Sequence, residues 1–280
     1  MKGSPPVRNV SILGCGWYGL PLAIRLARSG FNVMGSTTTE SKRQLLKSYN
    51  IDDYLITFDP GLKSDDRVEP FFDTDVLVFN IPPGIRKEDS SSKYRLLIDN
   101  VLPHICASTV RMVIFISSTS VYADLNRVVL EEDAGIGGLS ESGKVLLETE
   151  NLFRKKDEFS SVILRFGGLY GPERHPAKYL AGRSNLSNPE APVNLVHLED
   201  CIRVTERIIR KQITDRIFNV VSDEHPSRKR YYTETARRKG LQKPVFRDAD
   251  PTDTWKQVSN RKVKETLPYN FRYPSPYDGA

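Results

Sequence analysis

The sequence predicts an α/β fold, a Rossmann-type doubly wound parallel sheet with a small C-terminal substrate lobe. Short runs rich in β-branched residues alternate with helix-length segments along most of the 280 residues, which is the pattern of βαβ units. Most of these runs are apolar throughout, as expected for parallel strands that are buried on both faces. The first run is followed directly by a glycine-rich turn, Gly14–Gly19, and this is the third observation that favours the fold.

Seven apolar runs are predicted to be strands, and we expect them in the order 3-2-1-4-5-6-7 across the sheet. The seventh run would return to the sheet from the C-terminal part of the chain. In chain order the predicted strands are Val10–Leu13, Phe31–Gly35, Tyr54–Phe58, Val76–Phe79, Met112–Ile116, Ser161–Phe166 and Ile217–Val221.

Helices are predicted between these strands. Leu20, Ala23, Ile24 and Ala27 are spaced i, i+3, i+4 and i+7, which places them on one face of a helix. Gly30 follows, and glycine commonly ends a helix. The other predicted helices cover residues 40–48, 91–106, 141–156 and 199–211.

The regular alternation ends near residue 170. Four prolines interrupt the stretch up to residue 195, and the last sixty or so residues combine short helices with proline-rich loops. We therefore expect residues 1–170 to form an NAD(P)-binding domain and residues 171–280 a smaller substrate-binding lobe, with strand 217–221 returning to the sheet. Ligands of such sheets bind beyond the carboxyl ends of the strands, so the lobe would roof that crevice.

The composition is that of a globular protein, because 39% of the residues are hydrophobic. No apolar run approaches the roughly 18–20 residues of a membrane span, and the N-terminal residues lack the apolar region of a secretory signal. Cys15, Cys106 and Cys201 are odd in number and far apart, so we expect neither a disulfide framework nor a cysteine metal site. These features predict a cytoplasmic protein that has no membrane partner.

The net charge of +6 is concentrated near the C-terminus, where residues 223–280 hold 13 Lys or Arg against 8 Asp or Glu. Two basic triplets stand out, Arg228–Arg230 and Arg237–Lys239. They fit the solvated face of a helix, a basic mouth for an anionic substrate, or nucleic acid. No zinc-finger, RRM or helix-turn-helix pattern accompanies them, so no nucleic-acid partner is expected.

The glycine turn has the G-x-G-x-x-G pattern of a dinucleotide-binding loop, between a strand and an amphipathic helix. Gly14 would permit the tight turn, Gly16 would let the backbone approach a pyrophosphate, and Gly19 would let the helix pack closely on the strand. The helix N-terminus would then face the phosphates. Within this loop Trp17 and Tyr18 are further candidate cofactor contacts, and Cys15 is interpreted as a small spacer.

The end of the second strand predicts which nicotinamide cofactor is preferred. NAD sites usually hold an acidic residue there, which binds the ribose hydroxyls. Here Ser36, Thr37 and Thr38 occupy the position, and no carboxylate follows before Glu40. Hydroxyls followed by Lys42 and Arg43 would accept a 2′-phosphate, so NADP is expected in preference to NAD. After the third strand, Asp59 is a candidate contact for the adenine amino group, or else caps its own turn.

Six blocks of the sequence stand out when the predicted strands and turns are taken in order: Gly14–Gly19, Val78–Pro83, Phe115–Tyr122, Arg165–Pro172, Val193–Asp200 and Ile217–Val221. In order and content they resemble the extended short-chain dehydrogenase/reductase family, also called the NAD-dependent epimerase/dehydratase family. The resemblance covers nearly the whole chain. Details such as Gly-Trp-Tyr-Gly19 and Ser-Thr-Ser-Val-Tyr122 are most similar to an atypical subgroup, the YeeZ-type proteins.

The resemblance implies a catalytic Ser or Thr that binds the substrate oxygen, and a Tyr-x-x-x-Lys pair. In the family the tyrosine is the acid/base, and the lysine binds the nicotinamide ribose. Ser118 and Lys144 match this pattern, but Ser140 occupies the tyrosine position. A serine hydroxyl is a far weaker acid than a phenol, so the usual ketone/alcohol chemistry is not expected to run through this residue.

Three interpretations of this substitution follow. Tyr122 takes over as the proton donor, because it lies on the same loop as Ser118; in relatives this tyrosine mostly lines the substrate pocket. Alternatively the substrate is an activated iminium or a conjugated carbonyl, which is reduced without a phenol. In the third interpretation the chain binds a dinucleotide without turning it over.

Other residues are expected to complete the site. The resemblance places Asn80, Ile81 and Pro82, then Ser117, and then Gly167, Gly168 and Leu169 beside the cofactor. The two adjacent glycines would leave open space near the nicotinamide. Arg174 and His175 would clasp a substrate carboxylate or phosphate, or else be solvated on their loop. The four histidines form no ligand pattern, so no metal is expected.

Two functions from different classes therefore remain. The first is an NAD(P)-dependent oxidoreductase, or an epimerase/dehydratase-like enzyme, that acts on a small anionic or sugar-nucleotide substrate without the usual tyrosine. The second is a non-catalytic NAD(P)-binding redox sensor or interaction protein. Relatives often dimerise through the helices equivalent to 91–106 and 141–156, so the resemblance allows a homodimer.

Overall fold

A computed structural model describes residues 5–58, 61–64, 67–84, 90–135 and 137–279. Its main sheet has eight strands in the order β11-β8-β6-β5-β1-β2-β3-β4. The strands are β1 (Asn9–Leu13), β2 (Asn32–Thr37), β3 (Asp52–Phe58), β4 (Leu62–Ser64), β5 (Val76–Phe79), β6 (Met112–Ser118), β8 (Ser160–Phe166) and β11 (Arg216–Val220). The predicted fold class and the order of the seven predicted strands are confirmed. The sequence did not predict β4, which pairs antiparallel to β3.

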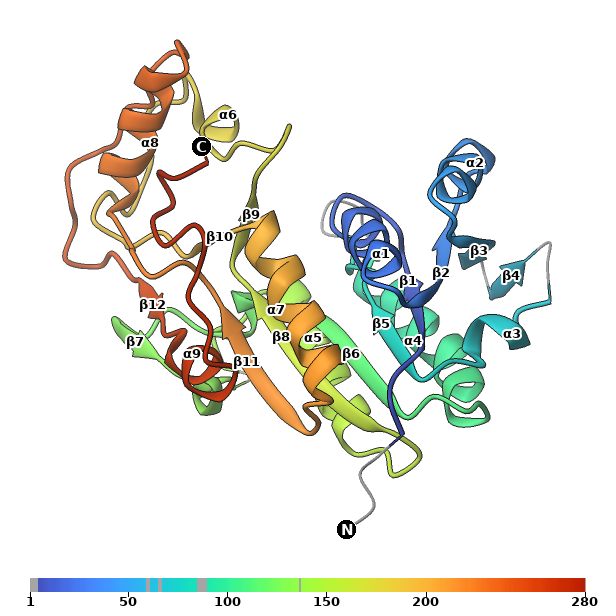
Figure 1. The fold of residues 1–280 in the computed structure, drawn as a ribbon. Coiled ribbons are helices and arrows are strands. Elements are labelled where there is room, and N and C mark those ends of the chain that lie inside the picture. The colour runs from blue at the N-terminus through green and yellow to red at the C-terminus, as the bar shows by residue number, and fades with distance from the viewer. Residues whose placement is uncertain (1–4, 59–60, 65–66, 85–89, 136, 280) are drawn as a thin grey trace. The chain divides into compact units, whose positions relative to one another are not determined.

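The strands nearest the glycine loop pair in parallel, as the apolar runs predicted. β1 pairs with β2 on one side and with β5 on the other, and β5 pairs in turn with β6 (Figure 1). The side chains of Val76–Phe79 are all fully buried, because both faces of a central parallel strand are covered.

The predicted helices form with ends that differ from the expected ones by at most two residues. Gly30 has a φ of +87°, which fits its predicted place after the end of the first helix. The helices are α1 (Gly19–Arg28), α2 (Glu40–Ser48), α3 (Glu69–Phe72), α4 (Ser90–Cys106), α5 (Glu141–Arg154), α6 (Ala177–Leu180), α7 (Leu198–Lys211), α8 (Arg228–Arg238) and α9 (Arg261–Thr266).

The chain divides into two compact units, each made of several segments. The first unit comprises Met1–Ser117, Glu141–Leu164 and Thr205–Ile217, and the second comprises Ser118–Ser140, Arg165–Val204 and Phe218–Ala280. The sequence divided the chain only once, at residue 170, apart from the returning strand. In the structure the second unit also takes residues from within the predicted first domain, because segments far apart in sequence pair with each other there.

The second unit contains two small parallel sheets that the sequence did not predict. In one, β9 (Gly168–Tyr170) pairs with β10 (Leu195–His197); in the other, β7 (Arg127–Val129) pairs with β12 (Lys256–Val258). Each of these strands has only three residues, so none has a periodicity that could be recognised locally. They form because their partners hold them in place.

The C-terminal segment of the second unit is anchored on one buried carboxylate. The side chain of Asp200 is fully buried, and it accepts a 2.6 Å hydrogen bond from the hydroxyl of Tyr269 and others from the backbone N–H groups of Arg272 and Tyr273. The ring of Tyr273 stacks on His197 at 3.6 Å between centroids. A buried carboxylate is unstable unless hydrogen bonds compensate its charge. The three donors to Asp200 are therefore held in place, and with them the C-terminal segment.

In the part of the chain that the structure describes, no helix is long and apolar enough to cross a membrane.

Candidate functional site

The glycine loop joins β1 to α1 in the first unit. Gly14 has a φ of +103°, and a Cβ atom there would lie 2.7 Å from the carbonyl oxygen of Asn80. A Cβ on Gly19 would lie 2.2 Å from the carbonyl oxygen of Gly14. Both contacts are closer than real Cβ atoms tolerate, so these two glycines are required by the turn and by the packing of α1.

Gly16 differs from these two glycines. A Cβ built on Gly16 would meet no heavy atom of the described residues within 4 Å. Neither the packing of the protein nor a positive φ therefore demands glycine at this position. The space that a side chain would fill is the space that a pyrophosphate needs above the start of the helix, so the loop fits a dinucleotide.

The loop is held from both sides by polar side chains at strand ends. The N–H of Gly14 donates to Oγ of Ser36 at 2.9 Å, and Nδ2 of Asn80 donates to the carbonyl oxygen of Gly14 at 3.0 Å. Cys15 adds a 2.8 Å backbone hydrogen bond to Ser36. Ser36 and Asn80 thus position the backbone of the glycine loop.

Three residues of the loop, Cys15, Trp17 and Tyr18, differ in how far they are buried. Tyr18 is buried at the start of α1, and its hydroxyl lies 2.7 Å from Oγ1 of Thr205 on α7. Trp17 is half-buried. Cys15 is buried, and burial raises the pKa of its thiol to about 12. The thiol is therefore protonated at neutral pH and has the character of a small spacer rather than of a redox group.

The residues that follow β2 differ in their exposure. Ser36 and Thr37 are buried, whereas Thr38 is exposed. Of the two predicted cations, Lys42 is exposed, but Arg43 on α2 forms an ion pair with Asp53 on β3. The exposed residues next to this strand end are Thr38, Thr39, Glu40, Ser41 and Lys42. Asp59 lies outside the described residues.

The next residues predicted to contact the cofactor lie at the carboxyl ends of β5 and β6. Tyr94 of α4 donates a 3.0 Å hydrogen bond to the carbonyl oxygen of Ile81, which holds the turn before Pro82. Ser117 is buried at the end of β6, and its hydroxyl donates to Oε1 of Glu150 at 2.5 Å. Ser117 therefore ties β6 to the buried side of α5.

Lys144 lies on α5, and it is paired within its own helix. Its Nζ is 2.7 Å from Oε1 of Glu141, and the Lys144 side chain is 37% exposed. This pair lowers the pKa of Glu141. Ser140 is exposed and immediately precedes the first residue of α5, a position that serine favours because its hydroxyl can cap the helix. Ser140, which the resemblance aligned with the family's tyrosine, therefore stands at the start of a helix.

Ser118 and Tyr122 lie in the second unit, on either side of a 3-10 turn over Thr119–Val121. Oγ of Ser118 is half-buried and accepts the N–H of Ser120 at 3.2 Å. The Tyr122 side chain is only 1% exposed. The two ends of this loop thus differ, since the serine remains partly accessible and the tyrosine is enclosed.

The hydroxyl of Tyr122 donates to Oδ1 of Asn219 at 2.6 Å and accepts from Nη1 of Arg165 at 2.7 Å. The same arginine nitrogen also donates to the backbone oxygen of Glu131, whose carboxylate accepts the N–H of Asn219. Burial is the largest influence on this phenol and raises the pKa of Tyr122. For Tyr122 to donate a proton to a substrate, this network would have to open.

Arg165 was missed by the sequence reasoning as a functional residue, although a signal was present. It is a single charge in the otherwise apolar stretch Val162–Phe166. A charge at a fully buried strand position must find partners inside the protein, and Arg165 is 2% exposed. Its partners Tyr122 and Glu131 were not recoverable, because they lie more than thirty residues away in the chain.

The glycines at the start of β9 were predicted to leave open space, and this prediction is wrong. A Cβ on Gly167 would lie 2.7 Å from the carbonyl oxygen of Asn194, and one on Gly168 would lie 2.6 Å from Cδ2 of Leu195. The two residues are glycine because β10 approaches them closely. Leu169 lies between them and Tyr170 on the same short strand.

Arg174 and His175 follow a tight turn in which Gly171 and Arg174 exchange backbone hydrogen bonds. His175 is 7% exposed, and its Nδ1 accepts the N–H of Ala177. Burial lowers the pKa of His175 to about 4, so the ring is neutral at pH 7. Nε2 of His175 is buried and the ring carries no charge, so only Arg174 brings a charge to the predicted anion clasp.

Among the described residues, no group of three His, Cys, Asp or Glu side chains is arranged to hold a metal ion.

Comparison with known proteins places these features in context. No protein-family model matches the chain. The chain is 34% identical over 276 residues to Protein YeeZ of Escherichia coli strain K12, which covers 96% of this chain and 98% of that protein. Protein YeeZ of Escherichia coli O157:H7 gives the same values.

Two solved structures with low sequence identity have the same fold. UDP-glucuronic acid 4-epimerase from Bacillus cereus, in complex with UDP-glucuronic acid and NAD, matches with a TM-score of 0.75 at 20% identity, over 97% of this chain and 96% of that one. MoeE5, in complex with UDP-glucuronic acid and NAD, matches with a TM-score of 0.74 at 19% identity, over 94% of each chain.

Proposed function

The chain belongs to the YeeZ family and has the fold of the NAD-dependent epimerases and dehydratases, and from this premise we propose that it is an NAD(P)-dependent enzyme. Its reaction would be an oxidoreduction, or an epimerase/dehydratase-like conversion, of a small anionic or sugar-nucleotide substrate. The observation that carries the proposal is Gly16, the middle glycine of the G-x-G-x-x-G turn, where nothing in the described protein fills the space of a side chain. The bound UDP-sugars and NAD of the two structural relatives support the same class.

NADP is the proposed cofactor, in preference to NAD. The support is the absence of a carboxylate among Ser36, Thr37 and Thr38, together with the exposure of Thr38 and Lys42. Arg43 adds little, because Asp53 already matches its charge. The further proposed contacts are the loop Gly14–Gly19 and the residues Asp59, Asn80, Ile81, Pro82, Ser117, Lys144, Gly167, Gly168 and Leu169.

A bound nicotinamide would supply the hydride chemistry, and the chain would supply positioning. The backbone of the glycine loop would bind the pyrophosphate, with Ser36 and Asn80 holding that backbone in place. Lys144 would bind the nicotinamide ribose after leaving Glu141, an exposed partner that binds it weakly. Ser118 would donate to the substrate oxygen through its partly accessible hydroxyl.

Proton transfer by a phenol is the step that this chain is least suited to perform. Ser140 cannot supply it, and the Tyr122 hydroxyl is occupied by Arg165 and Asn219. We therefore propose a substrate that needs little acid assistance, such as an activated iminium or a conjugated carbonyl. Tyr122 would position the loop that carries Ser118, and Arg174 would contribute the charge that holds an anionic substrate.

The enclosure of the Tyr122 hydroxyl also favours a second candidate function. A chain without an accessible phenol would still bind a dinucleotide, and it would then act as a non-catalytic NAD(P)-dependent redox sensor or interaction protein. For either function we propose a cytoplasmic protein, with a homodimer through α4 and α5 and without nucleic-acid partners.

Fluorescence titration with NADPH and NADH tests the cofactor site. A screen for nicotinamide oxidation with UDP-sugars, imines and enones then separates the two candidate functions. Saturable binding together with turnover supports the enzyme, and binding without turnover of any substrate in the screen supports the sensor. If neither nucleotide binds at millimolar concentration, both proposals are wrong.

A further inference from the structure

The second unit has an open pocket of about 610 Å³ beside α8, in the segment that carries the two basic triplets. Arg230, Thr233, Glu234 and Arg237 all line it. Their spacing of i, i+3, i+4 and i+7 places them on one face of the helix. The pocket therefore follows a continuous stripe of one helix rather than a scatter of surface residues.

Four of the residues that line this pocket are cations. Lys229, Arg230, Arg237 and Lys243 are exposed, and within the described chain their side chains form no ion pair or hydrogen bond. Four cations against two carboxylates, Glu190 and Glu234, leave the pocket with an excess of positive charge, which raises the local affinity for an anion.

Two other basic side chains of α8, unlike the four pocket cations, bind groups within the protein. Arg228 donates to the carbonyl oxygen of Ser187 at 2.8 Å and lies over the ring of Phe246. Arg238 is paired with Glu234. The carboxylate of Glu234 is thus already matched from outside the pocket.

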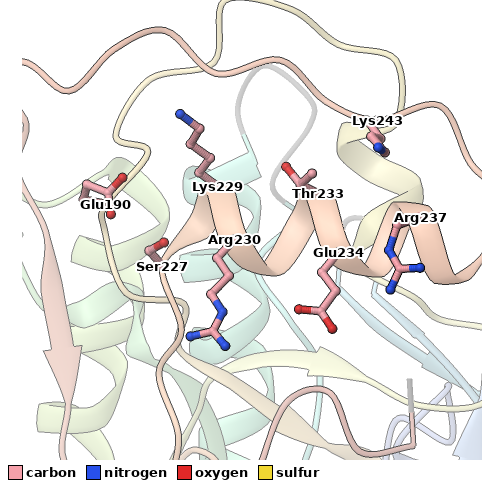
Figure 2. Close-up of a pocket in the computed structure, with 8 residues that line it drawn as sticks. All are labelled: Glu190, Ser227, Lys229, Arg230, Thr233, Glu234, Arg237 and Lys243. Carbon is pink, nitrogen blue, oxygen red and sulfur yellow. The ribbon is translucent and has the colours of Figure 1, made fainter.

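The four cations form two separate groups. Figure 2 shows Lys229 and Arg230 toward one end of α8, with their charged ends on opposite sides of the helix, and Arg237 and Lys243 toward the other end. Arg230 and Arg237 are seven residues apart, which is about 10.5 Å along a helix that rises about 1.5 Å per residue. A ligand that contacts both groups must therefore be anionic at two places about 10 Å apart.

The middle of the pocket has a different chemistry. Thr233 and Glu234 lie between the two cationic groups in Figure 2. A carboxylate there repels a phosphate but accepts a hydrogen bond from a hydroxyl. A second carboxylate, Glu190, lines the pocket near Ser227. This alternation disfavours a polymer that carries a negative charge on every unit.

We propose that this pocket is a binding site for a small polyhydroxylated molecule with a phosphate at each end, the chemical class of the sugar bisphosphates. Arg230 would bind one phosphate and Arg237 the other, because guanidinium groups form charge-assisted hydrogen bonds to phosphate oxygens. Lys229 and Lys243, on the other side of α8 in Figure 2, would add positive charge to the pocket. Hydroxyls of the central chain would donate to Glu234 and Glu190. The volume lies within the range of small-molecule sites, roughly 300–1,000 Å³.

Isothermal titration calorimetry of the intact protein tests this site, with fructose 1,6-bisphosphate as the probe and fructose 6-phosphate as the single-phosphate comparator. NADPH is present at saturation, so that the dinucleotide loop cannot bind the probes. We expect the bisphosphate to bind at least about tenfold more tightly than the monophosphate, a difference of about 1.4 kcal/mol. Its affinity should fall as salt is added.

The double variant Arg230→Gln/Arg237→Gln should weaken bisphosphate binding at least about tenfold, because each end loses its guanidinium. Lys239→Gln is the matched control, since it removes one exposed charge just beyond the end of α8 without lining the pocket. The control should bind as the unchanged protein does. NADPH affinity should be the same in all three proteins, which separates this site from the proposed dinucleotide site.

Three results would overturn the proposal. Equal affinities for the bisphosphate and the monophosphate would mean that only one end of the pocket binds. Pyrophosphate binding as tightly as the bisphosphate would mean that the separation of the two cationic groups is irrelevant. Unchanged binding by the double variant would place the ligand elsewhere.

Discussion

Nη1 of Arg165 donates a 2.7 Å hydrogen bond to the hydroxyl of Tyr122, and both side chains are at most 2% exposed. This hydrogen bond joins the loop that carries Ser118 to the segment Arg165–Val204 of the second unit. A buried arginine that loses one partner retains the cost of its desolvation. The pair therefore contributes to the stability of the second unit and keeps the Tyr122 hydroxyl engaged inside the protein.

The first prediction concerns this pair. Tyr122→Phe should lower the free energy of unfolding by about 1–3 kcal/mol, because Arg165 and Asn219 each lose a buried partner. Urea denaturation measures the change. Tyr179→Phe, at a position that is 54% exposed, is the control and should be nearly neutral. Equal effects of the two substitutions would show that the network contributes no stability.

The second prediction separates two glycines of one loop. Gly16→Ala should leave thermal stability nearly unchanged but weaken NADPH binding by at least about tenfold, because its Cβ occupies the space for the pyrophosphate. Gly19→Ala should instead destabilise the fold, since its Cβ would lie 2.2 Å from a carbonyl oxygen. Calorimetric titration and thermal melts measure the two effects. If Gly16→Ala binds NADPH normally, the dinucleotide site is elsewhere.

The third prediction concerns the choice of cofactor. NADPH should bind more tightly than NADH at low ionic strength, and the preference should shrink as salt screens the contact with the 2′-phosphate. Lys42→Gln should reduce the preference, whereas Arg43→Gln should act mainly on stability through the lost pair with Asp53. Titrations of both nucleotides at two salt concentrations provide the comparison. Tighter NADH binding at low salt would contradict the prediction.

The fourth prediction concerns pH. His175 has a folded pKa of about 4, below its ordinary value of 6.5. Between these two pH values the unfolded chain binds a proton that the folded chain does not, so stability falls as the pH is lowered from 6.5 toward 4. Replacing the ring in His175→Gln should flatten the stability profile in this window. Urea midpoints across the window test it, and an unchanged slope would refute it.

The fifth prediction concerns catalysis and applies once a substrate is found. Ser140→Ala should leave turnover nearly intact, because a serine at this position transfers no proton. Ser118→Ala should lower kcat, since its hydroxyl would bind the reacting oxygen. General acid help is worth roughly a hundred- to ten-thousandfold, so a loss of that size in Ser140→Ala, with Ser118→Ala unaffected, would reverse the assignment.

The sheet could be predicted from the sequence because its signals are local. A strand such as Val76–Phe79 is recognisable from four consecutive apolar residues, and α1 from its i, i+3, i+4, i+7 spacing. The turn between strand and helix is predicted by the residue type of Gly14 and Gly19 and by their spacing in the sequence. Each of these patterns reflects burial within one element, so neighbouring residues are sufficient to show it.

Only the tertiary structure decided which polar side chains already have partners within the protein. These partners determine which side chains of the candidate site are available to a ligand. Arg43 is matched by Asp53, Tyr122 is enclosed by Arg165 and Asn219, and a side chain at Gly167 would collide with the backbone of Asn194. In each case the partner lies ten to about a hundred residues away along the chain. The sequence alone determined which side chains are able to form hydrogen bonds and ion pairs. Their partners were decided by the packing of distant segments, because a hydrogen bond depends on distances that only the folded chain establishes.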